Sequence, residues 1–190
     1  MAEVYMAGDF RNGTTFEMDG NVFKVVEFQH VKPGKGSAFV RTKLKNVISG
    51  AVIEKTFNPS EKYPGAEIEK KEMQYLYNDE DLYYFMDNET YEQIEIPKDT
   101  IKDELQYLTV EKNAQVRFYG DEVLGIVLSD KVVLEVTNTP PGEKGNSATN
   151  TMKSAILETG IEIRVPMFIN NGDKIVVNTV TGKYDTRYKE

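Results

Sequence analysis

The feature that most constrains this chain is a series of short segments with β-strand character, separated by turn residues. Asn12-Gly13 and Asp19-Gly20 flank the first of them, and such pairs accept the positive φ angles of tight hairpin turns. Many short strands at roughly even spacing predict small closed barrels, because closure removes exposed strand edges. The predicted strands are residues 14–18, 22–28, 37–47, 74–77, 82–86, 92–96, 114–118, 122–127, 132–136, 161–165 and 174–178.

The spacing of turns predicts three all-β domains. A chain of 190 residues accommodates three barrels of about sixty residues each. Pro64-Gly65, after a polar stretch, marks the first boundary. The predicted domains are residues 1–65, 66–128 and 129–190.

A single helix is predicted, directly after Pro97. Apolar residues at helical spacing would share one face, and a polar residue in the first turn would act as the N-cap. The face consists of Ile101, Leu105 and Leu108, and the candidate caps are Asp99 and Thr100.

The composition excludes several classes of site and location. The chain has no cysteine and one histidine, which excludes disulfides, thiolate zinc sites and a cysteine nucleophile and suits a reducing cytoplasm. No run of 18 apolar residues exists to span a membrane. The N-terminal residues lack the basic stretch and apolar segment of a secretory signal. A cytoplasmic protein is expected.

The net charge of −8 hides a strong asymmetry. Residues 1–65 carry nine basic and seven acidic side chains, whereas residues 66–128 carry six and sixteen. Residues 129–190 carry eight of each. No acidic residue occurs between Glu27 and Glu54. This distribution indicates an oriented molecule whose basic end meets phosphate.

The basic end contains the stretch Val-Lys-Pro-Gly-Lys-Gly-Ser, residues 31–37, with Lys35 between two glycines. It predicts a hairpin tip, and the lysine is either a solvated turn residue or a probe held on a narrow stalk. The P-loop pattern fails because Gln29 and Gly36 stand at its fixed positions, and the dinucleotide pattern fails at Phe39. Along the following strand, period-two alternation separates Ala38, Val40, Thr42 and Leu44 from a second face of Phe39, Arg41, Lys43 and Lys45.

Three further groups of residues suggest sites, each with a plainer interpretation. His30 could serve a hydrolase with a nearby acid, or be a partly exposed strand residue. The run Asp79-Glu80-Asp81 could bind a metal, although consecutive carboxylates more often form a solvated turn. The third group is aromatic and consists of Tyr75, Tyr77, Tyr83, Tyr84, Phe85 and Tyr91. These rings could stack single-stranded bases, but their acidic surroundings favour a barrel core with an acidic rim.

Two regions together resemble the bacterial translation elongation factor P family. The C-terminal region reads Lys-Ser-Ala-Ile-Leu-Glu-Thr-Gly at 153–160, then Ile-Glu-Ile-Arg-Val-Pro at 161–166 and Phe-Ile-Asn-Asn-Gly-Asp at 168–173. The N-terminal region has Lys-Pro-Gly-Lys-Gly at 32–36, followed by Ala-Phe-Val-Arg and later by Glu-Lys-Thr-Phe at 54–57. The resemblance covers the whole chain.

The resemblance implies a KOW or SH3-like barrel followed by two OB-folds, in an L shape that mimics tRNA. It implies a non-enzymatic factor that binds both ribosomal subunits between the peptidyl-tRNA and exit sites and relieves stalling at consecutive prolines. The alternative is a paralogue of the same fold with another ribosomal role, against which the intact tip counts. The acidic central domain would either lower affinity for release or meet a basic ribosomal protein. No catalytic residue, metal, cofactor, membrane or DNA is implied, and a tRNA-shaped ligand is expected to be a monomer.

The resemblance also assigns roles to individual residues. Lys35 would reach the CCA end of the peptidyl-tRNA, after extension by a lysine-modifying enzyme. A lysine at this position excludes the sugar modification that some lineages place on a tip arginine. The tip loop is Lys32, Pro33, Gly34, Gly36 and Ser37. The expected RNA-binding residues are His30, Arg41, Lys43, Lys45, Asn146, Ser147, Lys153, Tyr184 and Arg187.

Overall fold

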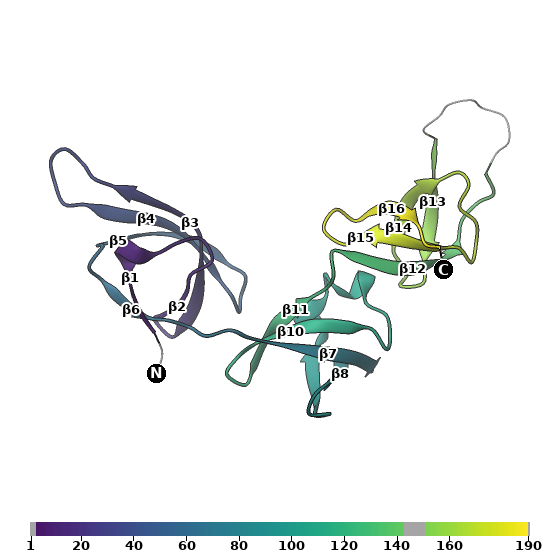
Figure 1. Ribbon diagram of the computed structural model, residues 1–190, viewed down its shortest axis with the longest axis horizontal. Helices are drawn as coiled ribbons and strands as arrows, with labels where there is room; N and C mark the ends of the chain where they lie inside the picture. Colours follow the sequence, from purple (N-terminus) through teal and green to yellow (C-terminus); the bar gives the residue numbers. More distant parts are fainter. Residues whose placement is uncertain (1–2, 143–150, 190) are drawn as a thin grey trace. The chain divides into compact units, whose positions relative to one another are not determined.

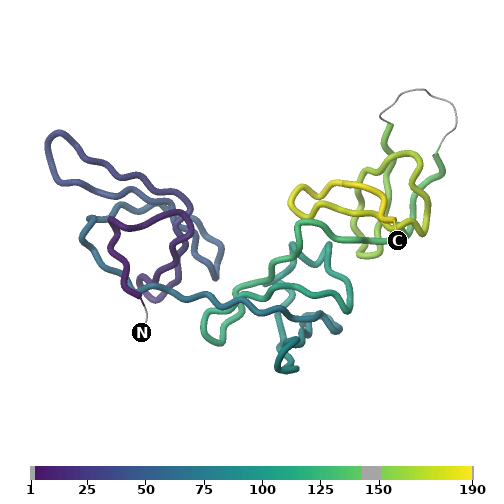
Figure 2. Tube along the Cα trace, in the orientation of Figure 1, coloured from purple at the N-terminus to yellow at the C-terminus, as the bar shows by residue number. Residues whose placement is uncertain are grey.

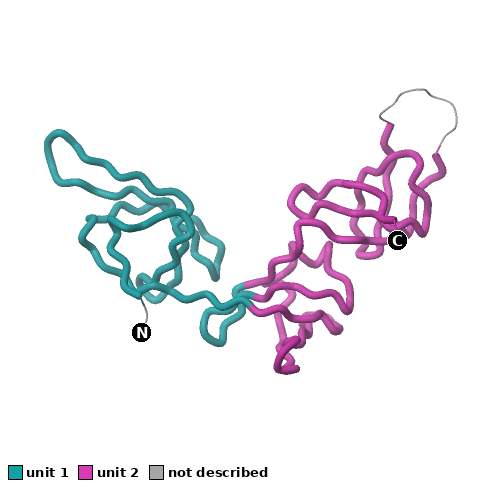
Figure 3. The backbone as a smooth tube through the Cα atoms, in the orientation of Figure 1, with its two compact units in different colours: residues 1–70, 117–124 teal, residues 71–116, 125–190 magenta. Residues whose placement is uncertain are grey.

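The computed structural model describes residues 3–142 and 151–189. The chain divides into two compact units, shown in teal and magenta in Figure 3. Unit 1 comprises residues 1–70 and 117–124, and unit 2 comprises residues 71–116 and 125–190. Strands dominate both units, so the prediction of an all-β fold is confirmed (Figure 1). Within the described ranges, no helix has the length and apolar character needed to cross a membrane.

Figure 1 shows the elements in their order along the chain. The first seven strands are β1 (Val4–Met6), β2 (Thr15–Met18), β3 (Asn21–Val31), β4 (Phe39–Asn46), β5 (Val52–Phe57), β6 (Lys62–Pro64) and β7 (Glu69–Asn78). The next four are β8 (Leu82–Asp87), β9 (Gln93–Pro97), β10 (Asn113–Tyr119) and β11 (Glu122–Val127). The last five are β12 (Lys131–Asn138), β13 (Met152–Leu157), β14 (Glu162–Pro166), β15 (Lys174–Asn178) and β16 (Lys183–Arg187). The short helices are η1 (Ala7–Asp9), α1 (Lys98–Ile101) and η2 (Leu105–Tyr107).

Unit 1 holds a four-stranded sheet, β2-β3-β4-β5, and the two-stranded sheet β1-β6. Asp19 and Gly20 both have positive φ, 52° and 74°, which confirms the primed hairpin turn between β2 and β3. The core is aromatic: Phe10 stacks on Phe16 at 4.5 Å and meets the edge of Phe57 at 5.4 Å, and all three are buried. This packing fixes the base from which the β3–β4 hairpin extends.

The other two sheets have the strand orders β11-β10-β7-β8-β9 and β14-β13-β12-β15-β16. The second encloses a cluster of buried aliphatic residues that includes Leu134, Val165 and Ile175. Tyr107 of η2 packs against this cluster, and the Thr159 hydroxyl donates to the Gln106 carbonyl at 2.6 Å. Within unit 2, the segment that carries η2 is therefore fastened to the C-terminal sheet.

The predicted helix is much shorter than its pattern suggested. It begins after Pro97 as expected but ends at Ile101, and the chain continues through turns into η2. Pro97 is the N-cap residue, so the expected capping by Asp99 or Thr100 is wrong. Ile101 and Leu108 are buried. The helical spacing of apolar residues therefore arises from a series of turns whose apolar side chains point inward, and not from a continuous helix.

Five strands were not predicted: β1, β5, β6, β13 and β16. β13 was missed in the sequence because Lys153, a charged residue, occupies an inward position of the strand and interrupts the apolar alternation. β5 was missed because two consecutive apolar residues, Val52 and Ile53, begin it without alternation, and both are exposed in the structure.

Candidate nucleic-acid interface

The β3–β4 hairpin extends beyond the rest of unit 1 (Figures 1 and 2). Its last rung pairs Val31 with Phe39. β2 ends opposite Lys24 of β3, whereas β5 follows β4 as far as Val40, one rung before the last. Beyond Val40 the hairpin consists of the final β3–β4 rung and a closing loop of residues 32–38.

Every residue of the 32–38 loop is exposed. Gly36 has a φ of +114°, outside the left-handed region that other residues visit, so the turn itself requires a glycine there. Gly34 is different: its φ is not positive, and a Cβ added to it would meet no atom within 4 Å. Among the described residues, none forms a hydrogen bond or ion pair with the Lys35 ammonium. The chain thus presents an unpartnered cation between one glycine that the fold needs and one that it does not.

Alternation along β4 is confirmed from Val40 to Lys45. Val40, Thr42 and Leu44 are buried, and the intervening side chains face outward. Arg41 is exposed, with its guanidinium carbon 5.9 Å from the centre of the Phe39 ring. This strand therefore has a basic outer side, as its pattern predicted.

The register of the sheet changes the charge of that outer side. Lys43 pairs with Glu27 on β3 and with Glu54 on β5, the two acids that bound the acid-free stretch of sequence. The Lys43 ammonium lies 3.4 Å from the Glu27 carboxylate. Lys24 pairs directly with Lys45 and is exposed, which adds a basic residue that the sequence reading missed.

His30 lies on β3, one rung before the end of the hairpin, and is exposed. Its ring meets the Phe28 ring edge-on, with centroids 5.6 Å apart. The Arg11 guanidinium carbon lies 5.5 Å from the centre of the same Phe28 ring. His30 thus belongs to an aromatic and cationic surface beside the tip, with no acidic group hydrogen-bonded to it in the described part of the chain.

The predicted RNA-binding residues of the C-terminal third fall in unit 2, in three different environments. Lys153 is buried, and its ammonium donates to the Pro140 carbonyl at 2.5 Å, so this lysine does not present its charge on the surface. Tyr184 is half-buried against the C-terminal core, and this burial raises the pKa of its phenol. Asn146 and Ser147 lie outside the described residues.

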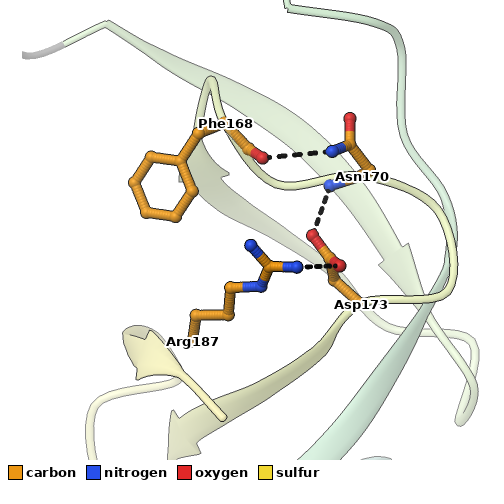
Figure 4. Close-up of polar contacts among 4 residues, drawn as sticks. All are labelled: Phe168, Asn170, Asp173 and Arg187. Carbon is orange, nitrogen blue, oxygen red and sulfur yellow. Dashed lines mark hydrogen bonds and ion pairs between the residues drawn. The ribbon is translucent and has the colours of Figure 1, made fainter. Parts of the chain in front are cut away.

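Of the three that the structure describes, Arg187 is the most accessible, and Figure 4 shows its polar contacts. Its side chain is 48% exposed, and one guanidinium nitrogen donates to the Asp173 carboxylate at 2.8 Å. The second oxygen of Asp173 accepts from the backbone N–H of Asn170 at 2.8 Å, and the Asn170 amide donates to the Phe168 carbonyl. The ion pair therefore braces the loop before β15 and still leaves part of the guanidinium open to solvent.

The Asp79-Glu80-Asp81 run forms a turn. The Asp79 carboxylate accepts the backbone N–H groups of Leu82 and Asp81 at 3.0 and 3.2 Å, and these bonds lower the pKa of its carboxyl group. The aromatic group divides: Tyr75 and Phe85 are buried in the core, as expected, whereas Tyr77 and Tyr91 are exposed. The core interpretation is thus confirmed for Tyr75 and Phe85 and wrong for the two exposed tyrosines.

Unit 2 also contains an open groove of about 660 Å³. Its lining mixes apolar side chains with both signs of charge, including Lys112 and Glu158. The Glu158 carboxylate already accepts a hydrogen bond from the backbone N–H of Glu135, at 2.9 Å. No single ligand chemistry is favoured by this lining.

Three family descriptions match the chain along its length. They are the elongation factor P KOW-like domain over residues 6–63, the elongation factor P OB domain over 68–126 and the elongation factor P C-terminal domain over 132–187. The elongation factor P of Acetivibrio thermocellus is 58% identical over 95% of this chain and 98% of its own. That of Ruminiclostridium cellulolyticum is 56% identical over 97% and 99%. Among solved structures, a translation initiation factor 5A from Methanococcus jannaschii shares the fold, with a TM-score of 0.55 and 24% identity over 66% of this chain and 92% of that one.

Proposed function

The chain belongs to the elongation factor P family and is a translation elongation factor, and from that premise we propose how it acts. It binds the ribosome between the peptidyl-tRNA and exit sites, contacts both subunits, and stimulates peptide-bond formation where consecutive prolines stall synthesis. The observation that carries this proposal is the Lys35 tip, an unpartnered cation at the end of a projecting hairpin.

The tip acts by position. Proline is a constrained nucleophile, so alignment of the two reacting groups limits the rate, and a factor that orders the peptidyl-tRNA supplies that alignment. Lys35 contacts the CCA end, where a cation on phosphate fixes position without reading sequence. The fold does not require glycine at position 34, but a residue without a side chain would let the loop enter a narrow passage in the ribosome.

The basic surface behind the tip continues the contact with RNA. It consists of Lys32, Arg41, Lys45 and Lys24, with His30 beside them, whereas Lys43 contributes less because Glu27 and Glu54 flank it. Among the C-terminal residues predicted to bind RNA that the structure describes, Arg187 is the best placed, since its guanidinium stays partly exposed. Lys153 is left out because its charge is buried.

The remaining features of the proposal follow from this role. The protein is not an enzyme, needs no metal or cofactor, and works in the cytoplasm as a monomer, away from membranes and DNA. Its domains are residues 1–65, 66–128 and 129–190. A separate enzyme extends the exposed Lys35 amine, which intact-mass and peptide mass spectrometry of protein from its native host would detect.

The test is Lys35→Ala, assayed in reconstituted translation of a message encoding three consecutive prolines and of a matched message without them. Because Lys35 is exposed and unpartnered, thermal unfolding should match wild type, while stimulation on the proline message is lost. Lys183→Ala, which removes an exposed lysine of β16, is the control and should keep full stimulation. Normal rescue by Lys35→Ala would overturn the assignment of the tip.

A further inference from the structure

The outer face of strands β7, β8 and β9 in unit 2 is unusually aromatic for an exposed sheet surface. Tyr77 pairs with Tyr84, and Tyr84 pairs with Glu95, so these three side chains lie in one row across the strands. Phe85 is buried, so the alternate positions of β8 point outward. Those positions, Leu82, Tyr84 and Met86, are all large and uncharged, and each keeps some exposure.

The two tyrosines of this row form a fixed stack. Their ring centres are 4.4 Å apart and their planes differ by 15°, while Tyr77 remains 52% exposed. The Tyr84 hydroxyl donates to the Asp79 carboxylate at 3.1 Å, and the 79–82 turn holds that carboxylate in place. The exposed ring of Tyr77 therefore rests on a partner that is itself anchored, so little rotamer entropy is lost when something docks on it.

The charge around this face is negative. The hydrogen bond from the Tyr84 hydroxyl to Asp79 is the main cause that raises the pKa of the Tyr84 phenol. The negative charges of Asp79 and Glu95 raise this pKa further. Residues 66–128 as a whole carry sixteen acidic and six basic side chains. Phosphate would be repelled here, so a nucleic acid is a poor occupant despite the stacked rings.

We propose that this face, made of Tyr77, Leu82, Tyr84, Met86 and Glu95 with Asp79 at its edge, docks an arginine-bearing segment of a basic protein. Tyrosine and methionine are enriched at the centres of protein interfaces, and acids at the rim complement a basic partner. A guanidinium can stack on the Tyr77 ring and bond a carboxylate at the same time, which an ammonium does less well. The surface is separate from the Lys35 tip and goes beyond the proposed action on peptidyl-tRNA.

The test uses the full chain and fluorescently labelled nona-arginine as the probe, with binding followed by anisotropy. Tyr77→Thr removes the exposed ring and keeps a strand-forming residue, and Glu95→Gln removes one charge. Each should weaken nona-arginine binding, by about fivefold for Tyr77→Thr, the factor expected for an exposed cation–π contact. Nona-lysine should bind wild type more weakly and should be insensitive to Tyr77→Thr.

Two matched controls keep the result interpretable. Tyr91→Asn removes another exposed tyrosine, from the turn between β8 and β9, at a φ of 62° that asparagine accepts. Asp103→Asn removes one charge from an exposed residue between α1 and η2 that is not part of the proposed set. Both should bind nona-arginine as wild type does. The proposal is overturned by equal weakening in the controls, by equal Tyr77 dependence of nona-lysine, by preferential binding of a single-stranded RNA nonamer to the face, or by self-association that Tyr77→Thr abolishes. No ribosome is present, so failure here would leave the Lys35 proposal intact.

Discussion

The two glycines beside Lys35 make opposite demands, and replacing each with alanine separates the needs of the fold from those of function. Gly36 has a φ of +114°, so alanine there is strained by about 1–3 kcal/mol in the observed tip conformation. At about 1.4 kcal/mol per factor of ten, that strain lowers the population of this conformation roughly five- to hundredfold. Gly34 carries no such strain, and its added methyl would touch nothing in the chain.

Gly34→Ala should therefore be silent or slightly stabilising in thermal unfolding, because alanine restricts the unfolded chain. In reconstituted translation of a three-proline message, the same variant should lose most of its stimulation if the stalk enters a passage that admits only a bare backbone. Gly36→Ala should also lose stimulation, but through the altered tip conformation. The two variants thus share a functional defect with different origins.

A semisynthetic protein with D-alanine at position 36 distinguishes the origins. D-Alanine accepts a positive φ and still carries a methyl group. If conformation alone matters at this position, D-alanine restores stimulation where L-alanine does not. Full activity of Gly34→Ala on the proline message would refute the narrow-passage reasoning, whatever the result at position 36.

Three further predictions concern stability. Phe10→Ala should cost about 3–5 kcal/mol, because it empties the centre of the aromatic core, and calorimetry should show an early transition absent from wild type. Asp87→Asn keeps the acceptor for two backbone N–H groups but removes the charge, and those bonds lower the pKa of the Asp87 carboxyl in wild type. Wild type should therefore have the higher free energy of unfolding above about pH 4. Urea titrations should show this difference between wild type and variant vanishing as the pH falls through the lowered pKa. Arg187→Gln should cost at most about 1 kcal/mol, since its ion pair with Asp173 is partly exposed, and 1 M salt should reduce the difference from wild type.

Local patterns in the sequence predicted the parts of the fold that local chemistry decides. Asp19-Gly20 predicted a primed turn because few other pairs tolerate two positive φ angles, and both angles are positive. The alternation from Val40 to Leu44 predicted which side of β4 is buried. Lys153 shows the limit of such patterns: its charge indicated an exposed residue, yet it lies inside, with the Pro140 carbonyl as its partner. That carbonyl is distant in sequence, and no local signal reports it.

The candidate site was predicted in the same uneven way. Lys35 was found because proline and glycine on either side leave few structures other than a projecting turn. The basic strand was overestimated, because an acid-free stretch of sequence is not an acid-free surface. Antiparallel pairing places Glu27 and Glu54, the acids that bound the stretch, on either side of Lys43.

That pairing also determines where phosphate should bind most strongly. A lysine between two carboxylates gives little to a phosphate, since its charge is largely balanced at short range. The cations of the hairpin without such neighbours are Lys32 and Lys35 in the loop, Arg41, which pairs with Gln29 and Thr56, and Lys24 beside Lys45, where two like charges face each other across the strands. Mutual repulsion of Lys24 and Lys45 is relieved when a phosphate lies between them, so their contribution to binding should exceed that of two separate lysines. Electrostatic attraction to RNA is therefore concentrated at the tip, at Arg41 and at the Lys24–Lys45 pair, with a weaker zone around Lys43.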